Sequence, residues 1–386
     1  MIPMKILMAT WEFPPNKVGG IASHCLDLSK TLVNQGHDVH VLTHGPEEKS
    51  FDIEGVHVYT IPSTGSAPDI VSWAMFLSHR MEKKAVELNK EEKFELVHAH
   101  DWMMVPAGVG IKKTLNIPMV FTIHSTEQGR FGIGSRMAKM INDLEWYGTY
   151  EADHIITVGK DFYNEVRSLF NPPENKMHYI PNGIDIERFD TQAKPINKND
   201  FAADWEDIIL FVGRLTRQKG LEYLIYAAPD ILKEHGEAKF VIVGKGNLNF
   251  YRSIASKVGV ANKMFFTGFL EDGIVLSLFK QATTTVIPSI YEPFGIVALE
   301  AAAGSRPSVG SYTGGLKETI VHEETGLHTY PGHSKSIADQ VNRILSDKNW
   351  ANHLGRKGRA RVEKNYKWDK IARWTAGVYG KALGLW

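Results

Sequence analysis

The stretch IILFVGRLTRQKG (208–220) joins an apolar run to a short basic loop, and a helical pattern follows from Leu221 to Glu234. The run is apolar on both faces, which is typical of a strand buried in a parallel sheet. Open α/β sheets bind their ligands in the loops that follow such strands. The stretch therefore predicts one unit of a doubly wound α/β fold with a binding loop after its strand.

The same alternation of strand-length runs and helical patterns occurs in both halves of the chain. In the first half the runs are KILMAT (5–10), DVHVLTH (38–44), VHVYTI (56–61), LVHAH (96–100), PMVFTIH (118–124), HIITVG (154–159) and HYIP (178–181). In the second half they are IILFVG (208–213), FVIVG (240–244), MFFTGF (264–269), TTVIP (284–288) and PSVG (307–310). Such alternation predicts parallel sheets with right-handed crossovers. We expect two doubly wound domains, 1–190 and 191–367, that join near the polar segment TQAKPINKND (191–200).

Composition limits the classes of partner. The chain of 386 residues is too long for one ordinary core. Its 44 basic and 44 acidic residues balance, so charge gives no reason to expect a nucleic-acid partner. The single cysteine, Cys25, excludes a disulfide scaffold and a thiolate metal site, and it fits a reducing cytoplasm.

No segment of the sequence indicates export or membrane insertion. The N-terminal MIPMKILMATWEFPP has one lysine and no small-residue cleavage site, so it predicts a first strand. No apolar run approaches the roughly 18 residues that span a bilayer. We expect a cytoplasmic protein without an integral membrane segment. The basic segment GRKGRARVEKNYK (355–367) fits a solvated helix face, with an anionic acceptor or a peripheral membrane contact as the alternatives.

Three loops that follow strands could approach an anion. In VGRLTRQKG (212–220), Arg214, Arg217 and Lys219 crowd a helix N-terminus, where the helix dipole disfavours cations. A pyrophosphate ligand would explain them, and solvated surface charge is the alternative. KVGG (17–20) and VGKG (243–246) would let backbone amides approach a phosphate, although either could be a plain turn, and neither is a G-x-G-x-x-G fingerprint.

Histidines end two strands of the first half. His124 lies in TIHSTEQGR (122–130), where a structural histidine is the alternative to a functional one. His98 and His100 in HAHDW share a strand face beside Asp101. They could suggest a metal, but no third ligand is evident nearby, and a strand end that lines a cleft is the favoured interpretation.

The stretch YEPFGIVALE (291–300) places two carboxylates around a turn. If Pro293 lies in the first turn and a helix begins near Phe294, Glu292 and Glu300 are about 12 Å apart along the axis. Glycosidase pairs lie roughly 5–9.5 Å apart, so these acids would hold two ends of an extended ligand instead. The amides of residues 295–297 would face a pyrophosphate between them.

Taken in order, these motifs resemble those of one enzyme family. KVGG, HAHDW, TIHSTEQGR, NGID (182–185), VGRLTRQKG, YEPFGIVALE and TGGLKE (313–318) are similar to the motifs of retaining nucleotide-sugar glycosyltransferases of the GT-B fold, specifically archaeal-like members of the glycogen and starch synthase group. The resemblance covers essentially the whole chain. It implies two Rossmann-like domains facing across a cleft, an N-terminal acceptor domain and a C-terminal donor domain, with a last helix (368–386) packing back on the first.

The resemblance also implies roles for single residues. Arg214 and Lys219 match the pair that binds the donor pyrophosphate, Glu292 the acid near the sugar hydroxyls, and Glu300 the acid on the ribose. His124 matches the histidine beside the reacting centre. The catalytic candidates are His124, Arg214, Lys219 and Glu292. The donor-binding candidates are Lys17, Gly19, Gly20, Arg214, Lys219, Gly246, Gly295, Ile296, Val297 and Glu300.

The resemblance implies glucose transfer from ADP- or UDP-glucose to an α-glucan, with retention and with neither a metal nor another cofactor. The partners would be a nucleotide sugar and a carbohydrate acceptor, and the oligomeric state stays undetermined. The alternatives are a small sugar, sugar-phosphate or lipid-linked acceptor, a nucleotide-sugar epimerase, and a non-catalytic binding protein.

Overall fold

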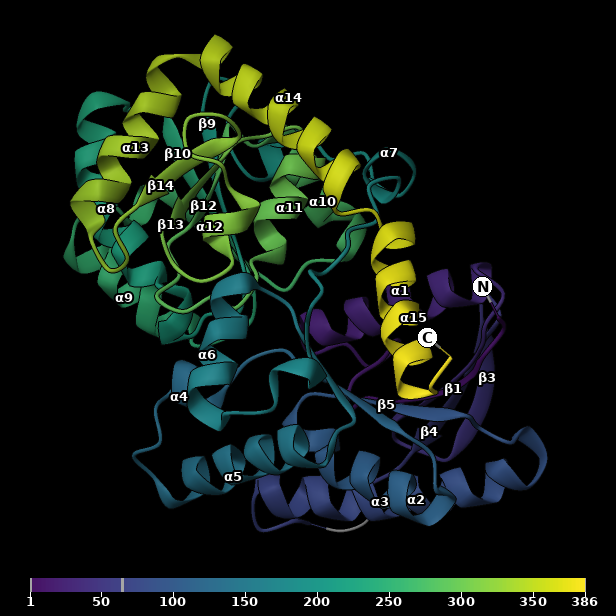
Figure 1. Cartoon of the computed structure of the whole chain (residues 1–386). Coiled ribbons are helices and arrows are strands. Elements are labelled where there is room, and N and C mark those ends of the chain that lie inside the picture. The colour runs from purple at the N-terminus through teal and green to yellow at the C-terminus, as the bar shows by residue number, and fades with distance from the viewer. Residues whose placement is uncertain (1, 64–65, 386) are drawn as a thin grey trace. The chain divides into compact units, whose positions relative to one another are not determined.

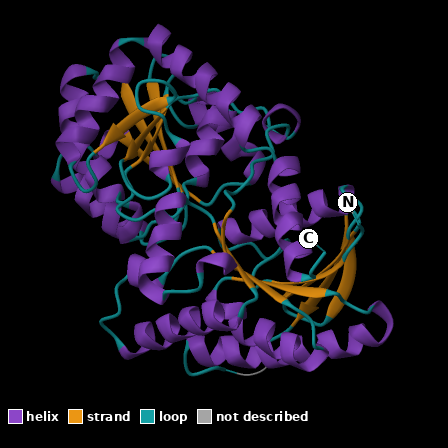
Figure 2. Cartoon of the chain, viewed as in Figure 1, coloured by secondary structure: helices purple, strands orange, loops and turns teal. Residues whose placement is uncertain are grey.

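The computed structural model describes residues 2–63 and 66–385 (Figures 1 and 2). The chain folds into two compact units, residues 1–183 with 368–386, and residues 184–367. Each unit holds a largely parallel sheet covered by helices, which confirms the predicted α/β class. No described helix combines the length and apolar character needed to cross a bilayer.

The first unit contains an eight-stranded sheet in the order β3-β4-β2-β1-β5-β6-β7-β8. Its strands are β1 (Lys5–Ala9), β2 (Asp38–His44), β3 (Lys49–Ile53), β4 (Val56–Ile61), β5 (Leu96–His100), β6 (Met119–Ile123), β7 (His154–Thr157) and β8 (Met177–Tyr179). All pairs are parallel except β3 with β4. Strand β3 was not predicted from the sequence; it is a largely exposed edge strand that a Glu54-Gly55 turn, with φ of 50° and 83°, folds back on β4.

Helices cover this sheet. They are α1 (Gly20–Asn34), α2 (Ile70–Glu92), α3 (Val105–Leu115), α4 (Glu127–Arg130), α5 (Arg136–Glu151), α6 (Lys160–Phe170) and α15 (Trp368–Ala382), with 3-10 turns at Trp102–Met104 and Glu174–Lys176. The apolar spacing of α1 buries Cys25, Leu28 and Leu32 against the sheet. The last helix, α15, shares this core through Trp368 and Tyr379, so the two ends of the chain lie in one unit (Figure 1).

The second unit contains a six-stranded parallel sheet in the order β11-β10-β9-β12-β13-β14. Its strands are β9 (Asp207–Val212), β10 (Ala238–Val243), β11 (Met264–Gly268), β12 (Thr284–Ile287), β13 (Ser308–Ser311) and β14 (Gly326–Thr329). Its helices are α7 (Arg188–Thr191), α8 (Leu221–Glu234), α9 (Leu248–Lys257), α10 (Asp272–Gln281), α11 (Ile296–Ala303), α12 (Leu316–Thr319), α13 (Ser334–Ser346) and α14 (Lys348–Asn365), with 3-10 turns at Lys198–Asp200, Arg217–Lys219 and Ala261–Lys263.

Each sheet reverses its strand order at one point. In the first unit, β2 lies on one side of β1 and β5 on the other, so the strand order reverses between β1 and β5. In the second unit, it reverses between β9 and β12. Ligands of doubly wound sheets bind outside the carboxyl ends of strands at such a switch point. The loops that follow β9 and β12, and those that follow β1 and β5, are therefore the places to look for a site.

The first unit ends at Gly183, not at residue 190. Ile184 already belongs to the second unit, where its amide donates to the Tyr366 carbonyl at 2.8 Å. The polar segment 191–200 also lies inside the second unit, since the Lys194 amide binds the Gly273 carbonyl at 3.0 Å. Polarity and proline marked a surface segment there, but the change of unit occurs earlier, within NGID.

Candidate functional site

An ion pair joins the loops after β9 and β12. Lys219 Nζ lies 2.6 Å from Glu292 Oε2, and the Ser289 hydroxyl donates to the same oxygen at 3.1 Å. Glu292 is only 8% exposed, so these two partners offset the cost of burying its carboxylate. The structure thus brings together two residues that were expected at different parts of one ligand.

The two loops also touch through their backbones. The Ile290 amide donates to the Gln218 carbonyl at 2.8 Å. Gly220 has a φ of 63°, and a Cβ at this position would lie 2.0 Å from the Pro288 carbonyl oxygen. Only glycine fits such an approach, and the glycine of LTRQKG therefore sets the distance between the two loops.

The expected helix start in YEPFGIVALE is wrong. The helix α11 begins at Ile296, and Gly295 precedes it with a left-handed φ of 93°. Glu292 lies in a loop, held by the Gly315 amide, which donates to its carbonyl at 2.9 Å. The estimate of about 12 Å assumed helical rise from Glu292 onward; only Ile296 to Glu300 follow that rise, which amounts to about 6 Å.

Glu300 occupies a half-buried position within α11. Burial raises the pKa of its carboxyl to about 7; Arg188 opposes this shift, and Asp272 adds to it. A carboxyl in this range titrates near neutral pH, a property that clusters at functional sites. If Glu300 binds a ligand, the affinity for that ligand should therefore depend on pH near neutrality.

The other donor-binding candidates of the second unit lie in the loops that follow its strands and in the first turn of α11. Arg214 is exposed, directly after Gly213. Gly246 lies against the same loop, because a Cβ there would be 2.5 Å from the Cβ of Leu215. The amides of Ile296 and Val297 belong to the first turn of α11, where amides lack intrahelical acceptors. The structure thus gives Gly246 a packing role and leaves cationic and amide donors at the strand ends.

In the first unit, three histidines gather near the carboxyl ends of β5 and β6. His100 ends β5, His124 follows β6, and His100 Nδ1 lies 3.2 Å from His124 Nε2. The His24 ring, from α1, lies 4.8 Å from the His124 ring. Burial, followed by the neighbouring histidines, lowers the pKa of both His100 and His124 well below the usual range. His124 is therefore neutral at pH 7.

His98 does not line a cleft, which corrects the expectation for HAHDW. It is fully buried, and its two ring nitrogens bind the Tyr379 hydroxyl and the Thr122 hydroxyl, each at 2.7 Å. Both ring nitrogens are thus used within the fold. His98 positions α15 on the sheet, and His100 is the member of the pair that faces the histidine cluster.

Two residues of this region were not predicted from the sequence. His24 follows KVGG by one helical turn, and that spacing was the available signal. Glu12 lies in the loop after β1, and its Oε2 accepts from the Val18 amide at 2.7 Å and the Gly19 amide at 2.6 Å. The amides of KVGG thus have a carboxylate partner within the chain, and the roles of Lys17, Gly19 and Gly20 toward a donor stay predictions.

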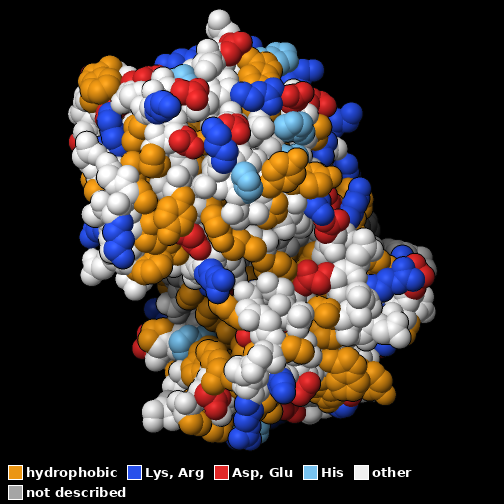
Figure 3. All heavy atoms as spheres, turned by 90° about the vertical axis from the view of Figure 1, so that its left-hand side faces the viewer, with side chains coloured by type: hydrophobic (Ala, Val, Ile, Leu, Met, Phe, Trp, Pro, Cys, Tyr) orange, Lys and Arg blue, Asp and Glu red, His pale blue; other side chains and the backbone are white. Residues whose placement is uncertain are grey.

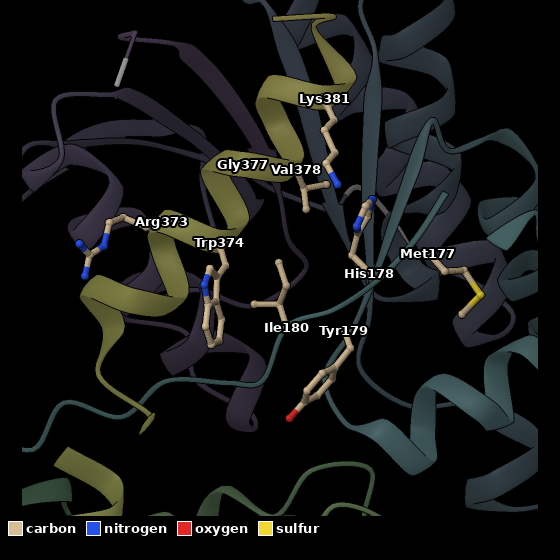
Figure 4. Close-up of a pocket in the computed structure, with 9 residues that line it drawn as sticks. All are labelled: Met177, His178, Tyr179, Ile180, Arg373, Trp374, Gly377, Val378 and Lys381. Atoms are coloured by element: carbon tan, nitrogen blue, oxygen red, sulfur yellow. The ribbon is translucent and has the colours of Figure 1, made fainter. Parts of the chain in front are cut away.

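A separate cavity of about 420 Å³ lies in the first unit between β8 and α15 (Figure 4). Figure 4 shows the rings of Tyr179 and Trp374 and the amine of Lys381 around it. His178 also lines it and binds His154 at 3.0 Å. Among the described residues, none of the predicted site residues lines this cavity. It is therefore distinct from the loops at the strand ends.

Comparison with known proteins decides the family. Residues 18–188 match the family model described as Glycosyltransferase Family 4, and residues 194–361 match Glycosyl transferases group 1. The chain is 44% identical to an uncharacterised glycosyltransferase of Methanocaldococcus jannaschii over 99% of both chains. The chain is a glycosyltransferase.

Two further likenesses refine this assignment. The glycosyltransferase is 32% identical to the glycogen synthase of Mycobacterium tuberculosis over 97% of this chain and 94% of that relative. Its structure is similar to sucrose-phosphate synthase from Thermosynechococcus elongatus, with a TM-score of 0.85, 21% identity and coverage of 99% and 100% of the two chains. The structural likeness shows the GT-B fold that the sequence motifs imply, and the resemblance to the glycogen synthase group is confirmed.

Proposed function

We propose that this glycosyltransferase moves glucose from ADP- or UDP-glucose to an α-glucan with retention at the anomeric carbon. The observation that carries the proposal is the Lys219–Glu292 pair, 2.6 Å apart at the β9–β12 switch point, beside the N-terminus of α11. The 32% identity with a glycogen synthase supports the choice of acceptor. The basic loop supports a nucleotide diphosphate as the leaving group.

The pair has a specific consequence for donor binding. Lys219 has three N–H donors, and Glu292 uses one of them. An incoming diphosphate would share the amine with Glu292, with Arg214 as the second cation. Glu292, held by Ser289, would then accept hydrogen bonds from hydroxyls of the transferred sugar, while Glu300 accepts hydrogen bonds from those of the ribose. The cation thereby couples the phosphate end of the donor to its sugar end.

The proposed reaction needs no side chain as a base, because the departing phosphate can take the proton of the acceptor. The bond between the anomeric carbon and the leaving phosphate oxygen breaks, and its electron pair leaves with the nucleoside diphosphate. The acceptor hydroxyl oxygen attacks from the same face, and its proton passes to the departing phosphate. Arg214, Lys219 and the α11 amides stabilise the charge that develops on that phosphate. His124, neutral and hydrogen-bonded to His100, is assigned to contact the sugar on the family resemblance.

A screen for nucleotide release tests the proposal. ADP- and UDP-glucose are each incubated with glycogen, maltooligosaccharide, small sugars, sugar phosphates or no acceptor. We expect release of nucleoside diphosphate that depends on glycogen or maltooligosaccharide. Release only with a small or phosphorylated sugar would move the acceptor to that class. A new nucleotide sugar without any acceptor would indicate an epimerase, and no release in any mixture would contradict the proposal.

A further inference from the structure

A second cluster of ionisable side chains lies at the amino ends of β2 and β4, the end of the sheet opposite His100. Residues two apart on a strand share a face, so Asp38 and His40 lie on one side of β2. The register pairs His40 with His57 on β4. Glu92 joins them from the end of α2. The sheet and the end of α2 therefore bring two imidazoles and two carboxylates to one place.

The spacing of the ligand atoms suits a small cation. His40 Nε2 lies 3.0 Å from Asp38 Oδ1, and His57 Nε2 lies 3.8 Å from the same oxygen. Glu92 Oε2 lies 3.6 Å from His40 Nε2. Zinc bonds of 2.0–2.1 Å in a tetrahedron separate the ligand atoms by about 3.4 Å. One ion could bind Asp38, His40 and His57 after small side-chain movements.

The outer contacts of both rings direct their Nε2 atoms inward. His57 Nδ1 donates to Asp52 Oδ1 at 2.7 Å, and because that carboxylate only accepts, a neutral His57 has its lone pair on Nε2. His40 Nδ1 lies 3.2 Å from the Tyr59 hydroxyl. A carboxylate or another polar group behind each imidazole is the usual arrangement around metal-binding histidines.

One further observation points to a ligand at this place, and the contacts of Lys5 show which carboxylate oxygen is available to it. His40 is 1% exposed, and its Nε2 has no hydrogen-bond partner among the described residues. A divalent cation bound to this nitrogen and to Asp38 Oδ1 would give both groups a partner. Lys5 binds Asp38 Oδ2 at 2.9 Å and Glu92 Oε2 at 2.7 Å, which holds Asp38 Oδ1 toward the two rings.

We propose that Asp38, His40 and His57 bind one divalent cation of the zinc class, with Glu92 or water as the fourth ligand. Two imidazoles with a carboxylate favour zinc over magnesium or calcium, which prefer oxygen ligands. The side chains of His57 and Asp38 are 44% and 39% exposed, so an ion can enter from solvent. The ion would link β2 to β4 far from the histidine cluster at the strand ends. It would therefore be structural.

Zinc binding to the full chain, stripped of metal with a chelator, tests the site by equilibrium dialysis and elemental analysis. The wild type should bind one tight Zn²⁺ per chain. His57→Gln should weaken that binding at least tenfold, and Asp52→Asn should weaken it about tenfold through the outer contact. His178→Gln is the matched control, because His178 also lies on this sheet in a pair of histidines, and it should bind like the wild type.

The histidine cluster His24, His100 and His124 is the competing location, since its nitrogens also lie within 4.8 Å of one another. His124→Gln decides between the two. Retention of the tight ion in this variant, together with its loss in His57→Gln, supports the proposal. Loss in His124→Gln with retention in His57→Gln overturns it, as does a wild type that binds no Zn²⁺. Circular dichroism of each variant confirms that it is folded.

Discussion

At the scale of single residues, Lys219 and Glu292 show how two side chains distant in sequence come to share one site. The sequence predicted both as catalytic candidates, and Lys219 as a donor-binding residue as well, because each follows a strand in a motif that resembles those of the family. It could not predict their ion pair, 2.6 Å long, because that contact depends on β9 and β12 being neighbours. Which residue pairs with Lys219 therefore depends on the order of the strands in the sheet.

The carboxyl of Glu300 makes a pH dependence measurable. With a pKa of about 7, it gains a proton as the pH falls below neutrality and then loses acceptor capacity for ribose hydroxyls. We expect the KM for the nucleotide sugar to rise as the pH falls from 8 to 6, and Glu300→Gln to raise KM at pH 8 and flatten the profile. An unchanged profile in Glu300→Gln would argue against a role for this carboxyl in donor binding.

The same residue affects stability with a defined sign. Its pKa is higher in the native state than the ordinary 4.5, so the native state holds a proton that the unfolded chain loses. The free energy of unfolding should therefore decrease as the pH rises from about 4.5 to about 7. In Glu300→Gln this contribution to the slope should be absent in urea denaturation. A slope identical to that of the wild type would indicate that other groups cause it.

At the scale of elements, the sequence predicted most strands and misplaced the start of one helix. Parallel strands that are buried on both faces leave a strong apolar signal. The start of α11 was missed because Pro293 suits a first helical turn, whereas the contacts with TGGLKE that hold residues 292–294 in a loop are tertiary. The edge strand β3 was missed because its exposed side chains resemble a loop.

The close approach of the loops after β9 and β12 predicts a large effect at one glycine. Gly220→Ala places a Cβ 2.0 Å from the Pro288 carbonyl oxygen, in addition to the strain of a positive φ. Gly259 has a similar φ of 77° with no atom within 4 Å, and Gly259→Ala is therefore the control. We expect about 1–2 kcal/mol of destabilisation in the control and clearly more in Gly220→Ala, measured by urea unfolding. Equal losses would show that the loops separate readily.

Helix α15 depends on a buried hydrogen bond for its docking. Tyr379 is fully buried, and its hydroxyl binds His98 at 2.7 Å. Tyr379→Phe leaves a buried imidazole nitrogen without its partner and should reduce the free energy of unfolding by about 1–3 kcal/mol. Tyr226→Phe, at an exposed position, should change it by less than about 0.5 kcal/mol. Equal small changes would mean that packing alone holds the helix.

At the scale of the whole molecule, the sequence predicted two α/β units, and the chain passes from the first unit to the second within NGID. Polar composition was a poor guide to this point, because Ile184 and Ile186 are buried in the second unit while the polar segment follows them. On the face drawn in Figure 3, basic and acidic side chains are interspersed, as the balance of 44 and 44 suggests. An anionic donor of the proposed kind would therefore have to be recognised by a few placed cations.

If Lys219, Arg214 and Glu292 form the donor site of this glycosyltransferase, paired measurements of binding and turnover should separate their roles. Lys263→Ala is the matched control, because Lys263 pairs with Glu206 at 2.9 Å and its side chain is 21% exposed, close to the 19% of Lys219. Nucleoside diphosphate binding is measured by calorimetry, and turnover by nucleotide release from the active donor.

We predict that Glu292→Ala abolishes turnover yet keeps nucleoside diphosphate binding within a few-fold of the wild type, because Glu292 contacts the sugar end of the donor. Arg214→Ala should lose both binding and turnover, and Lys263→Ala should keep both. Equal, small effects of Glu292→Ala and Arg214→Ala, close to those of Lys263→Ala, would mean that these residues do not form a donor site.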